Sequence, residues 1–174
     1  RVNTFNMEAK LRAIARPVPT ESLSLTALNK KITKRFAVGK KVLVIGGSRG
    51  LGCYTVKILA LMGANITFSY AKGTQDAERL KKELADRNIG VKLVHFDVID
   101  PKFDKLFANK PDYIFYFSTP KIFVKRSKGF EKDLYSNFKL FYVDTFKAIL
   151  DKCVSLSVKH VFYPSSVAVL DETK

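Results

Sequence analysis

The pattern of apolar and polar positions changes near residue 40. Before it, residues 5–15 place apolar side chains at every odd position, which predicts a half-buried strand, although the same residue types also form helices well. Residues 16–26 contain two prolines and several hydroxyl side chains, which is typical of a linker. We therefore interpret residues 1–39 as the tail of a preceding segment plus a basic linker, and expect residues 1–30 to be poorly tied to the following domain or packed on it as an appendage.

From residue 40 onward, short apolar runs alternate with longer stretches of helical periodicity. The short runs predict strands at 41–46, 65–70, 91–96, 112–117 and 159–164. The stretches between them predict helices over about 50–62, 74–88, 101–109 and 130–156. Nearly continuous apolar strands indicate burial on both faces, and alternation with helices requires right-handed crossovers between parallel strands. Residues 40–174 are thus predicted to form an α/β domain with a doubly wound parallel sheet.

A cluster of glycines lies at the first predicted strand-to-helix turn, in the sequence GGSRGLG at residues 46–52. Gly46, Gly50 and Gly52 can form a tight turn, let the backbone approach a pyrophosphate and allow close helix packing. The free amides and the dipole at the start of the helix would then face the phosphates. Strand, glycines, helix and second strand in this order predict a dinucleotide site, and a glycine-rich turn without a ligand is the alternative.

The spacing G-x-x-x-G-x-G of these glycines resembles the short-chain dehydrogenase/reductase family, and the resemblance spans about residues 40–170. It implies a Rossmann-like fold with strand order 3-2-1-4-5, a ligand crevice between the first and fourth strands, and a chain truncated after the fifth strand. It also implies that Ser48, Arg49 and Leu51 contact the cofactor together with the glycines. Ile45 stands where the family usually has a threonine, which removes one hydroxyl without disabling the phosphate turn.

Two further stretches carry the resemblance. In HFDV, Asp97 and Val98 are similar to the family's adenine-contacting pair, and the alternative for Asp97 is a helix cap or turn residue before Pro101. In VFYPSSVAVLD, Ser166 is similar to the serine that hydrogen-bonds the substrate carbonyl, with Ser165 as backbone support. Without the resemblance, the two serines would be interpreted as a turn.

Other stretches depart from the family pattern. The chain has FSTP where the family usually has a stretch like N-N-A-G, so Ser118, Thr119 and Pro120 can line the cofactor but the usual asparagine is absent. Asn137 lies one turn before the position expected for a helix asparagine of the proton relay, which holds Phe141. We therefore assign no residue to that role.

The largest departure concerns the family's Tyr-x-x-x-Lys motif, which supplies the proton donor and its lysine. Tyr135 and Lys139 have this spacing, but they precede the serine strand, whereas the family places the motif after it. On a helix such a pair is more often a packed aromatic ring and a solvated charge. We expect either a fragment of a longer enzyme or a protein that is not a catalyst.

The second predicted strand ends in SYAKG and is followed by no acidic residue before Asp76. An acid at that strand end would select NAD by binding the ribose 2′-hydroxyl. Here Ser69 offers a hydroxyl, Lys72 a cation and Arg49 a guanidinium suited to phosphate. These residues predict a preference for NADP(H), and the alternative is that both cations are only solvated.

Composition and charge limit the other function classes. A composition that is 47% hydrophobic and 12% aromatic is that of a globular domain. The net charge of +15 could suggest nucleic acid, but the basic residues are spread over helix faces, and the denser patch at 30–41 is interpreted as a solvated linker. Cys53 and Cys153 have neither metal-ligand nor disulfide spacing, which favours a reducing, cytoplasmic setting. No stretch approaches the roughly 18 apolar residues of a membrane span.

We therefore expect an NADP(H)-dependent short-chain oxidoreductase whose full-length form acts on a small carbonyl or alcohol substrate, with no metal. A dinucleotide-binding or sensing protein without catalysis is the alternative, and a nucleic-acid or anion-binding module is the weaker one. We also expect exposed apolar sheet surface that favours self-association into a homo-oligomer.

Overall fold

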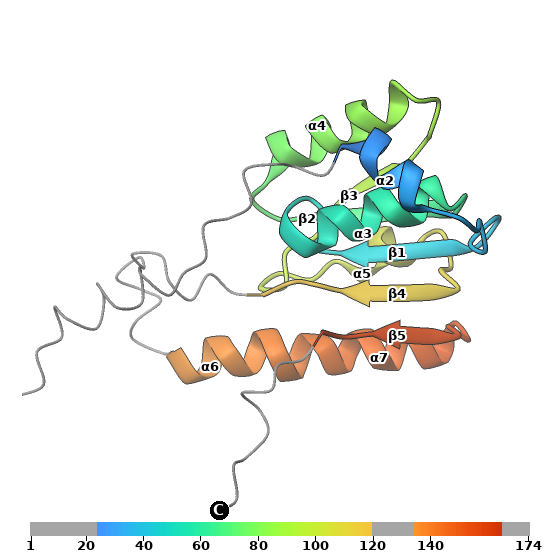
Figure 1. The fold of residues 1–174 in the computed structure, drawn as a ribbon. Helices are drawn as coiled ribbons and strands as arrows, with labels where there is room; N and C mark the ends of the chain where they lie inside the picture. The colour runs from blue at the N-terminus through green and yellow to red at the C-terminus, as the bar shows by residue number, and fades with distance from the viewer. Residues whose placement is uncertain (1–23, 120–133, 165–174) are drawn as a thin grey trace, which may run out of the picture.

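The computed structural model describes residues 24–119 and 134–164, and its centre is a five-stranded parallel sheet (Figure 1). The strands are β1 (Lys41–Ile45), β2 (Asn65–Tyr70), β3 (Lys92–His95), β4 (Tyr113–Tyr116) and β5 (His160–Phe162). Their order is β3-β2-β1-β4-β5, and all four neighbouring pairs are parallel. The predicted α/β fold and the order 3-2-1-4-5 are confirmed, and each strand lies within its predicted range.

Helices cover both faces of this sheet. They are α2 (Leu25–Lys31), α3 (Gly50–Leu61), α4 (Thr74–Ala85), α5 (Phe103–Phe107), α6 (Leu134–Lys139) and α7 (Thr145–Ser155), with the π-helix η2 (Leu140–Asp144) joining the last two. Helices α2, α3 and α4 lie on one face, and α5 and α7 lie on the other (Figure 1). The structure therefore has the three layers of a doubly wound domain.

Successive residues of the strands belong to different cores, as the pleat of a strand requires. Val44 of β1 packs with the cluster under α3 and α4, whereas its neighbours Leu43 and Ile45 pack with Ile149 of α7. All four of these side chains are almost completely buried. Because both faces of β1 are covered, the strand is apolar throughout instead of alternating with polar residues.

Helix α2 lies in a stretch for which the sequence predicted no helix. Its N-cap is Ser24, whose Oγ accepts a hydrogen bond from the amide of Ala27 at 3.2 Å. Leu25 and Leu28 are 2% and 5% exposed and belong to the core cluster that includes α3. Helix α2 is thus packed on the domain, while the boundary drawn at residue 39 stays a prediction.

The helix predicted over 130–156 is not one continuous α-helix in its described part. At η2 the amide of Thr145 donates to the carbonyl of Leu140, five residues earlier. The carbonyl of Phe141 instead accepts the hydroxyl of Tyr116 at 3.2 Å, a buried bond between this helix and β4. Burial also raises the pKa of the Tyr116 hydroxyl far above its ordinary value, so it remains a donor at physiological pH.

A second buried hydrogen bond anchors the start of α7. Thr145 is 3% exposed, and its Oγ1 donates to the carbonyl of Val98 at 3.0 Å. The hydroxyl thereby connects α7 to the segment that follows β3. In residues 24–119 and 134–164, no helix has both the length and the apolar character needed to cross a membrane.

Candidate nucleotide site

The glycine turn lies where the carboxyl ends of β1 and β4 approach each other. Gly46 has φ +81°, and a Cβ added there would lie 3.0 Å from the carbonyl carbon of Phe117 and from the amide nitrogen of Ser118. Both a left-handed backbone and the absence of a side chain are therefore required at this position. The backbones at the ends of β1 and β4 are thus nearly in contact where the sequence predicts the ligand crevice, and the crevice itself stays a prediction.

The first turn of α3 packs directly on this glycine turn. A Cβ on Gly52 would lie 2.3 Å from the carbonyl oxygen of Gly46, and one on Gly47 would lie 2.7 Å from Cβ of Phe68. Gly50 differs, because a Cβ there would meet nothing within 4 Å, but its φ is +53°. The absence of a side chain at Gly52 and Gly47 thus allows close packing, whereas Gly50 provides a left-handed backbone conformation.

The end of β2 holds the turn in place through Ser69. Its Oγ accepts the amide of Gly46 at 3.1 Å, and its carbonyl accepts the amide of Gly47 at 2.9 Å. Ser69 is only 1% exposed. We predicted from the sequence that this hydroxyl contacts the cofactor, which stays a prediction; in the structure the hydroxyl supports the turn, and sequence spacing did not indicate that role.

Main-chain donors gather at the start of α3. The first intrahelical bond runs from the amide of Cys53 to the carbonyl of Arg49 at 3.2 Å, so the amides of Gly50, Leu51 and Gly52 precede the hydrogen-bonded ladder. The N-cap, Arg49, makes no capping bond with its side chain. These donors and the positive end of the helix dipole can bind an anion. Leu51 beside them is 63% exposed and offers apolar surface.

A group of charged side chains lies beside the turn. Nε of Arg49 is 3.2 Å from Oδ2 of Asp76, and the other carboxylate oxygen of Asp76 accepts from Arg79. The Arg49 guanidinium passes over Gly73, where an added Cβ would lie 2.9 Å from one of its terminal nitrogens. Lys72 is exposed directly before this glycine. The region is therefore rich in cations, and two of them, Arg49 and Arg79, are already paired with Asp76.

The adenine pair predicted from HFDV follows β3. Oδ1 of Asp97 accepts the amide of Ile99 at 3.1 Å, which makes Asp97 a turn residue and leaves its second carboxylate oxygen available. Val98 is 2% exposed and packs in the core, so it can reach a ligand only through its main chain. Both the turn interpretation and the adenine contact remain compatible with this geometry.

The remaining predicted residues lie near the end of β4 or beyond the described part of the chain. Ser118 is half-buried and Thr119 is exposed directly after β4. Pro120, Ser165 and Ser166 lie outside the described residues, as do the side chains of Tyr135 and Asn137. Lys139 is described, and its Nζ lies 3.1 Å from Oδ1 of Asp144, an exposed ion pair within the helix.

Neither cysteine is prepared for nucleophilic chemistry. Burial raises the pKa of the Cys53 thiol, and it outweighs the nearby Lys57 ammonium, which lowers it. Burial likewise raises the pKa of Cys153 to about 11. Both side chains are therefore neutral thiols near pH 7. Within the described ranges, no three His, Cys, Asp or Glu side chains gather as a metal site.

Comparison with known proteins agrees with this geometry. Residues 40–110 match the family model of the short chain dehydrogenases. A 45-residue stretch is 47% identical to the cyclic-di-GMP-binding biofilm dispersal mediator protein of Escherichia coli K12, and it covers 26% of this chain and 19% of that protein.

Solved structures with the same fold are similar over most of the chain at low identity. A short-chain dehydrogenase/reductase from Serratia marcescens superposes with a TM-score of 0.64 at 19% identity, over 79% of this chain and 60% of its own. Acetoin dehydrogenase from Enterobacter cloacae gives 0.63 at 18% identity, over 79% and 58%. A blue fluorescent protein from a metagenomic library, solved with NADPH, gives 0.58 at 20% identity, over 79% and 60%. The chain thus spans at most three fifths of the length of these proteins.

Proposed function

We propose that the chain forms the cofactor-binding part of an NADP(H)-dependent oxidoreductase of the short-chain dehydrogenase/reductase family, whose family model matches residues 40–110. In the full-length protein this part would serve the interconversion of a small carbonyl compound and its alcohol. The observation that carries the proposal is the glycine turn of residues 46–52, which packs so closely that no side chain fits at Gly46, Gly47 or Gly52.

The turn fits a dinucleotide pyrophosphate in both shape and charge. Because Gly46 and Gly52 have no side chains, the turn packs closely on β4 and α3, and at Gly50 an added Cβ would meet nothing within 4 Å, so an anion can approach the backbone there. The amides of Gly50, Leu51 and Gly52 would donate hydrogen bonds to the phosphate oxygens, and the dipole of α3 favours negative charge there. Ser69 contributes indirectly, since it holds the amide of Gly46 in place.

The cations near the end of β2 support the preference for NADP(H). The ribose 2′-phosphate would lie among Arg49 and Lys72, whose donors suit a phosphate better than a hydroxyl. Asp76 is the nearest acid in the sequence, and its carboxylate is directed to Arg49 and Arg79. A carboxylate held by two guanidiniums is a weak acceptor for a ribose hydroxyl, which argues against selection of NAD(H).

We assign the residues the following roles in the reaction as part of this proposal. The bound cofactor would supply the hydride chemistry. The chain's own residues would bind and orient the cofactor. Asp97 and the main chain of Val98 would contact the adenine, and the glycine turn would bind the pyrophosphate. The cofactor would also be lined beside β4 by Ser118, Thr119 and Pro120. Ser166 would hold the substrate oxygen by a hydrogen bond. A proton donor would have to come from a group that we do not assign.

Calorimetric titration with NADPH and with NADH tests the cofactor assignment. We expect tighter binding of NADPH, and loss of that preference in the double variant Arg49→Ala with Lys72→Ala. Lys147→Ala, an exposed lysine on α7, is the matched control. Equal affinity for both cofactors, or a preference that survives the double substitution, would contradict the assignment. In the full-length protein, Ser166→Ala should reduce carbonyl-dependent oxidation of NADPH.

A dinucleotide-binding protein without catalysis is the second candidate. The Tyr-x-x-x-Lys string of this chain gives no support for catalysis, because the ammonium group of Lys139 is paired with Asp144. An assay of NADPH oxidation by the full-length protein against a panel of small aldehydes and ketones separates the two candidates. Binding of NADPH without turnover of any of them would favour the second.

A further inference from the structure

Strand β3 forms an open edge of the sheet. It is the terminal strand in the order β3-β2-β1-β4-β5, and it pairs only with β2. The amide of Phe96 donates to the carbonyl of Tyr70, so the main-chain groups of Val94 and Lys92, at even spacing from it, also face β2. The amides and carbonyls of Leu93 and His95 therefore face outward, where no described residue pairs with them.

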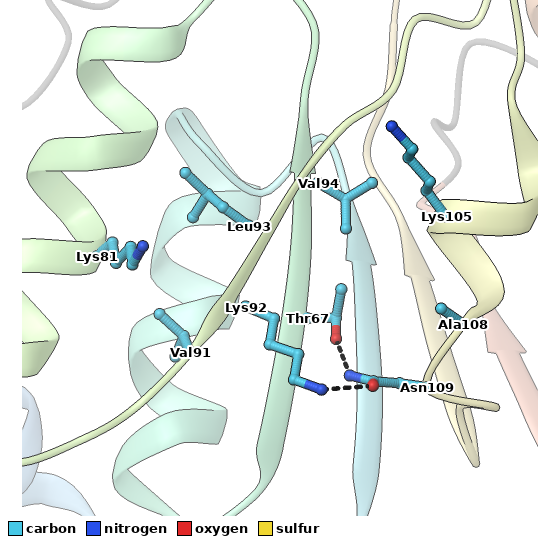
Figure 2. Close-up of a pocket in the computed structure, with 9 residues that line it drawn as sticks. All are labelled: Thr67, Lys81, Val91, Lys92, Leu93, Val94, Lys105, Ala108 and Asn109. Carbon is cyan, nitrogen blue, oxygen red and sulfur yellow. Dashed lines mark hydrogen bonds between the residues drawn. The ribbon is translucent and has the colours of Figure 1, made fainter.

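A cavity of about 360 Å³ follows this edge (Figure 2). Successive residues of the strand segment 91–94 line it, and successive residues of a strand point to opposite faces. The cavity therefore wraps around the edge of the sheet and does not lie on one face. Lys81 of α4 flanks it on one side, and Lys105 of α5 flanks it on the other (Figure 2).

The lining of this edge cavity carries positive charge only. Lys81, Lys92 and Lys105 line it, no carboxylate does, and none of the three forms an ion pair with the described residues. Nζ of Lys92 donates to Oδ1 of Asn109 at 2.8 Å. Nδ2 of Asn109 in turn donates to Oγ1 of Thr67 at 2.7 Å (Figure 2). This chain of hydrogen bonds fixes the Lys92 ammonium at the cavity while leaving its charge uncompensated.

We propose that this edge binds an acidic segment of another protein in extended conformation, which pairs with β3 as an added strand. Outward amides and carbonyls offer both donors and acceptors, the pattern that an extended peptide satisfies. The three lysines would pair with acidic side chains at the flanks of such a peptide. The site lies on the edge strand, away from the glycine turn, and it does not depend on the cofactor.

Two other occupants fit the edge less well. A nucleic-acid strand could use the lysines, but its phosphates would face the outward carbonyls without any donor to offer them. A second copy of β3 would bring two sets of lysines together, and like charges across a strand pair are destabilising. Charge on the edge thus opposes self-pairing and selects a partner of opposite charge.

Fluorescence polarisation with a labelled nonapeptide of alternating glutamate and valine tests the proposal on the purified protein. We expect saturable binding that falls about tenfold or more in Lys92→Glu with Lys105→Glu, since charge reversal replaces attraction by repulsion. Lys147→Glu, on α7, is the matched charge control and should leave the affinity unchanged. The same peptide with lysine in place of glutamate should not bind.

Strand pairing is tested separately from charge. His95→Pro removes one outward amide without removing a bond to β2, so it should weaken the peptide, whereas His95→Ala should not. A nonapeptide with a central proline makes the same test from the ligand side and needs no change in the protein. Equal binding of the proline peptide, binding of a nine-nucleotide single-stranded DNA as tight as that of the acidic peptide, or an equal loss in Lys147→Glu would overturn the proposal.

Discussion

Arg49 and Asp76 form an ion pair beside the glycine turn, with Nε 3.2 Å from Oδ2. The other oxygen of Asp76 holds Arg79, so one carboxylate organises two guanidiniums that would otherwise repel each other. The Arg49 side chain is 50% exposed and that of Asp76 28% exposed, so a ligand can reach both groups. A phosphate that binds Arg49 must therefore compete with a carboxylate that is already in place.

Asp76→Asn should increase affinity for NADPH several-fold and change affinity for NADH much less. The substitution removes the competing charge, and a partly exposed pair of this kind is worth about 0.2–1 kcal/mol. Titration with 2′,5′-ADP and with ADP isolates the 2′-phosphate contribution. Glu78→Gln, an exposed acid on the same helix, is the control. An equal gain in affinity for both nucleotides would show that Asp76 acts only through the general electrostatic potential of the site and not on the 2′-phosphate.

Gly52→Ala should disrupt the turn, whereas Gly90→Ala should be almost silent. The new methyl group at residue 52 would lie 2.3 Å from the Gly46 carbonyl oxygen, so α3 or the turn has to move. We expect a loss of about 1–3 kcal/mol in the free energy of unfolding and a large loss of nucleotide affinity. At Gly90 an added Cβ meets nothing within 4 Å. Urea denaturation and calorimetry measure the two effects, and similar results for both variants would contradict the packing argument.

Removal of Glu83 should destabilise the contact between α3 and α4. The Lys57 side chain is only 6% exposed, and its Nζ lies 2.8 Å from Oε1 of Glu83. Glu83→Ala leaves a buried ammonium without its partner, which costs about 1–3 kcal/mol. Glu78→Ala, also on α4, is the control for the change in helix propensity. The double variant Lys57→Met with Glu83→Ala should recover part of the loss; a double variant less stable than Glu83→Ala alone would count against this account.

Cys53 should react slowly with iodoacetamide at neutral pH. Burial raises the pKa of its thiol, and because the thiolate is the reactive form, the rate should rise only as pH increases past the ordinary thiol range near 8.5. The Cys153→Ser variant reports on Cys53 alone. A rate profile with its inflection below pH 7.5 would mean that the dipole of α3 prevails over burial.

The aromatic face of β4 and β5 should promote self-association. Phe115 and Phe162 stack with ring centroids 4.5 Å apart, and Phe162 remains 47% exposed. Grouped exposed aromatic rings favour association. Phe162→Ser should shift the sedimentation profile toward monomer. Val154→Ser, at an apolar position on α7 that is 82% exposed, should not; an unchanged profile in Phe162→Ser would locate the contact elsewhere.

Local patterns were sufficient to predict the sheet and the glycine turn. Apolar runs bounded by polar residues identify each strand, and the order of strand, glycines and helix places the turn, because both depend on neighbours in sequence. The pairing of Arg49 with Asp76 was not predicted, since it depends on the orientation of α4 relative to the turn. The hydrogen bond from the Gly46 amide to Ser69 was not predicted for a similar reason, because this bond joins the ends of two strands.

The apolar periodicity of the sequence did not predict helix α2 or the π-helix η2. Leu25 and Leu28 form a buried pair, but the prolines and hydroxyl side chains upstream led to the interpretation of a linker. In 130–156 the apolar spacing predicts one helix. At the interruption, η2, the Phe141 carbonyl accepts a hydrogen bond from Tyr116, a tertiary contact that no helical pattern contains.

The π-helix also affects how this chain can be aligned with its relatives. Its wider turn accommodates one residue more than an α-helical turn of the same length, so positions before Leu140 and after Asp144 are out of step by one. Against a relative whose helix is uninterrupted, a correct alignment needs a one-residue gap within residues 140–144. A gapless alignment would misassign every residue on one side of η2, so any role transferred to Asn137 or Lys139 from homologues must be read from superposed backbones.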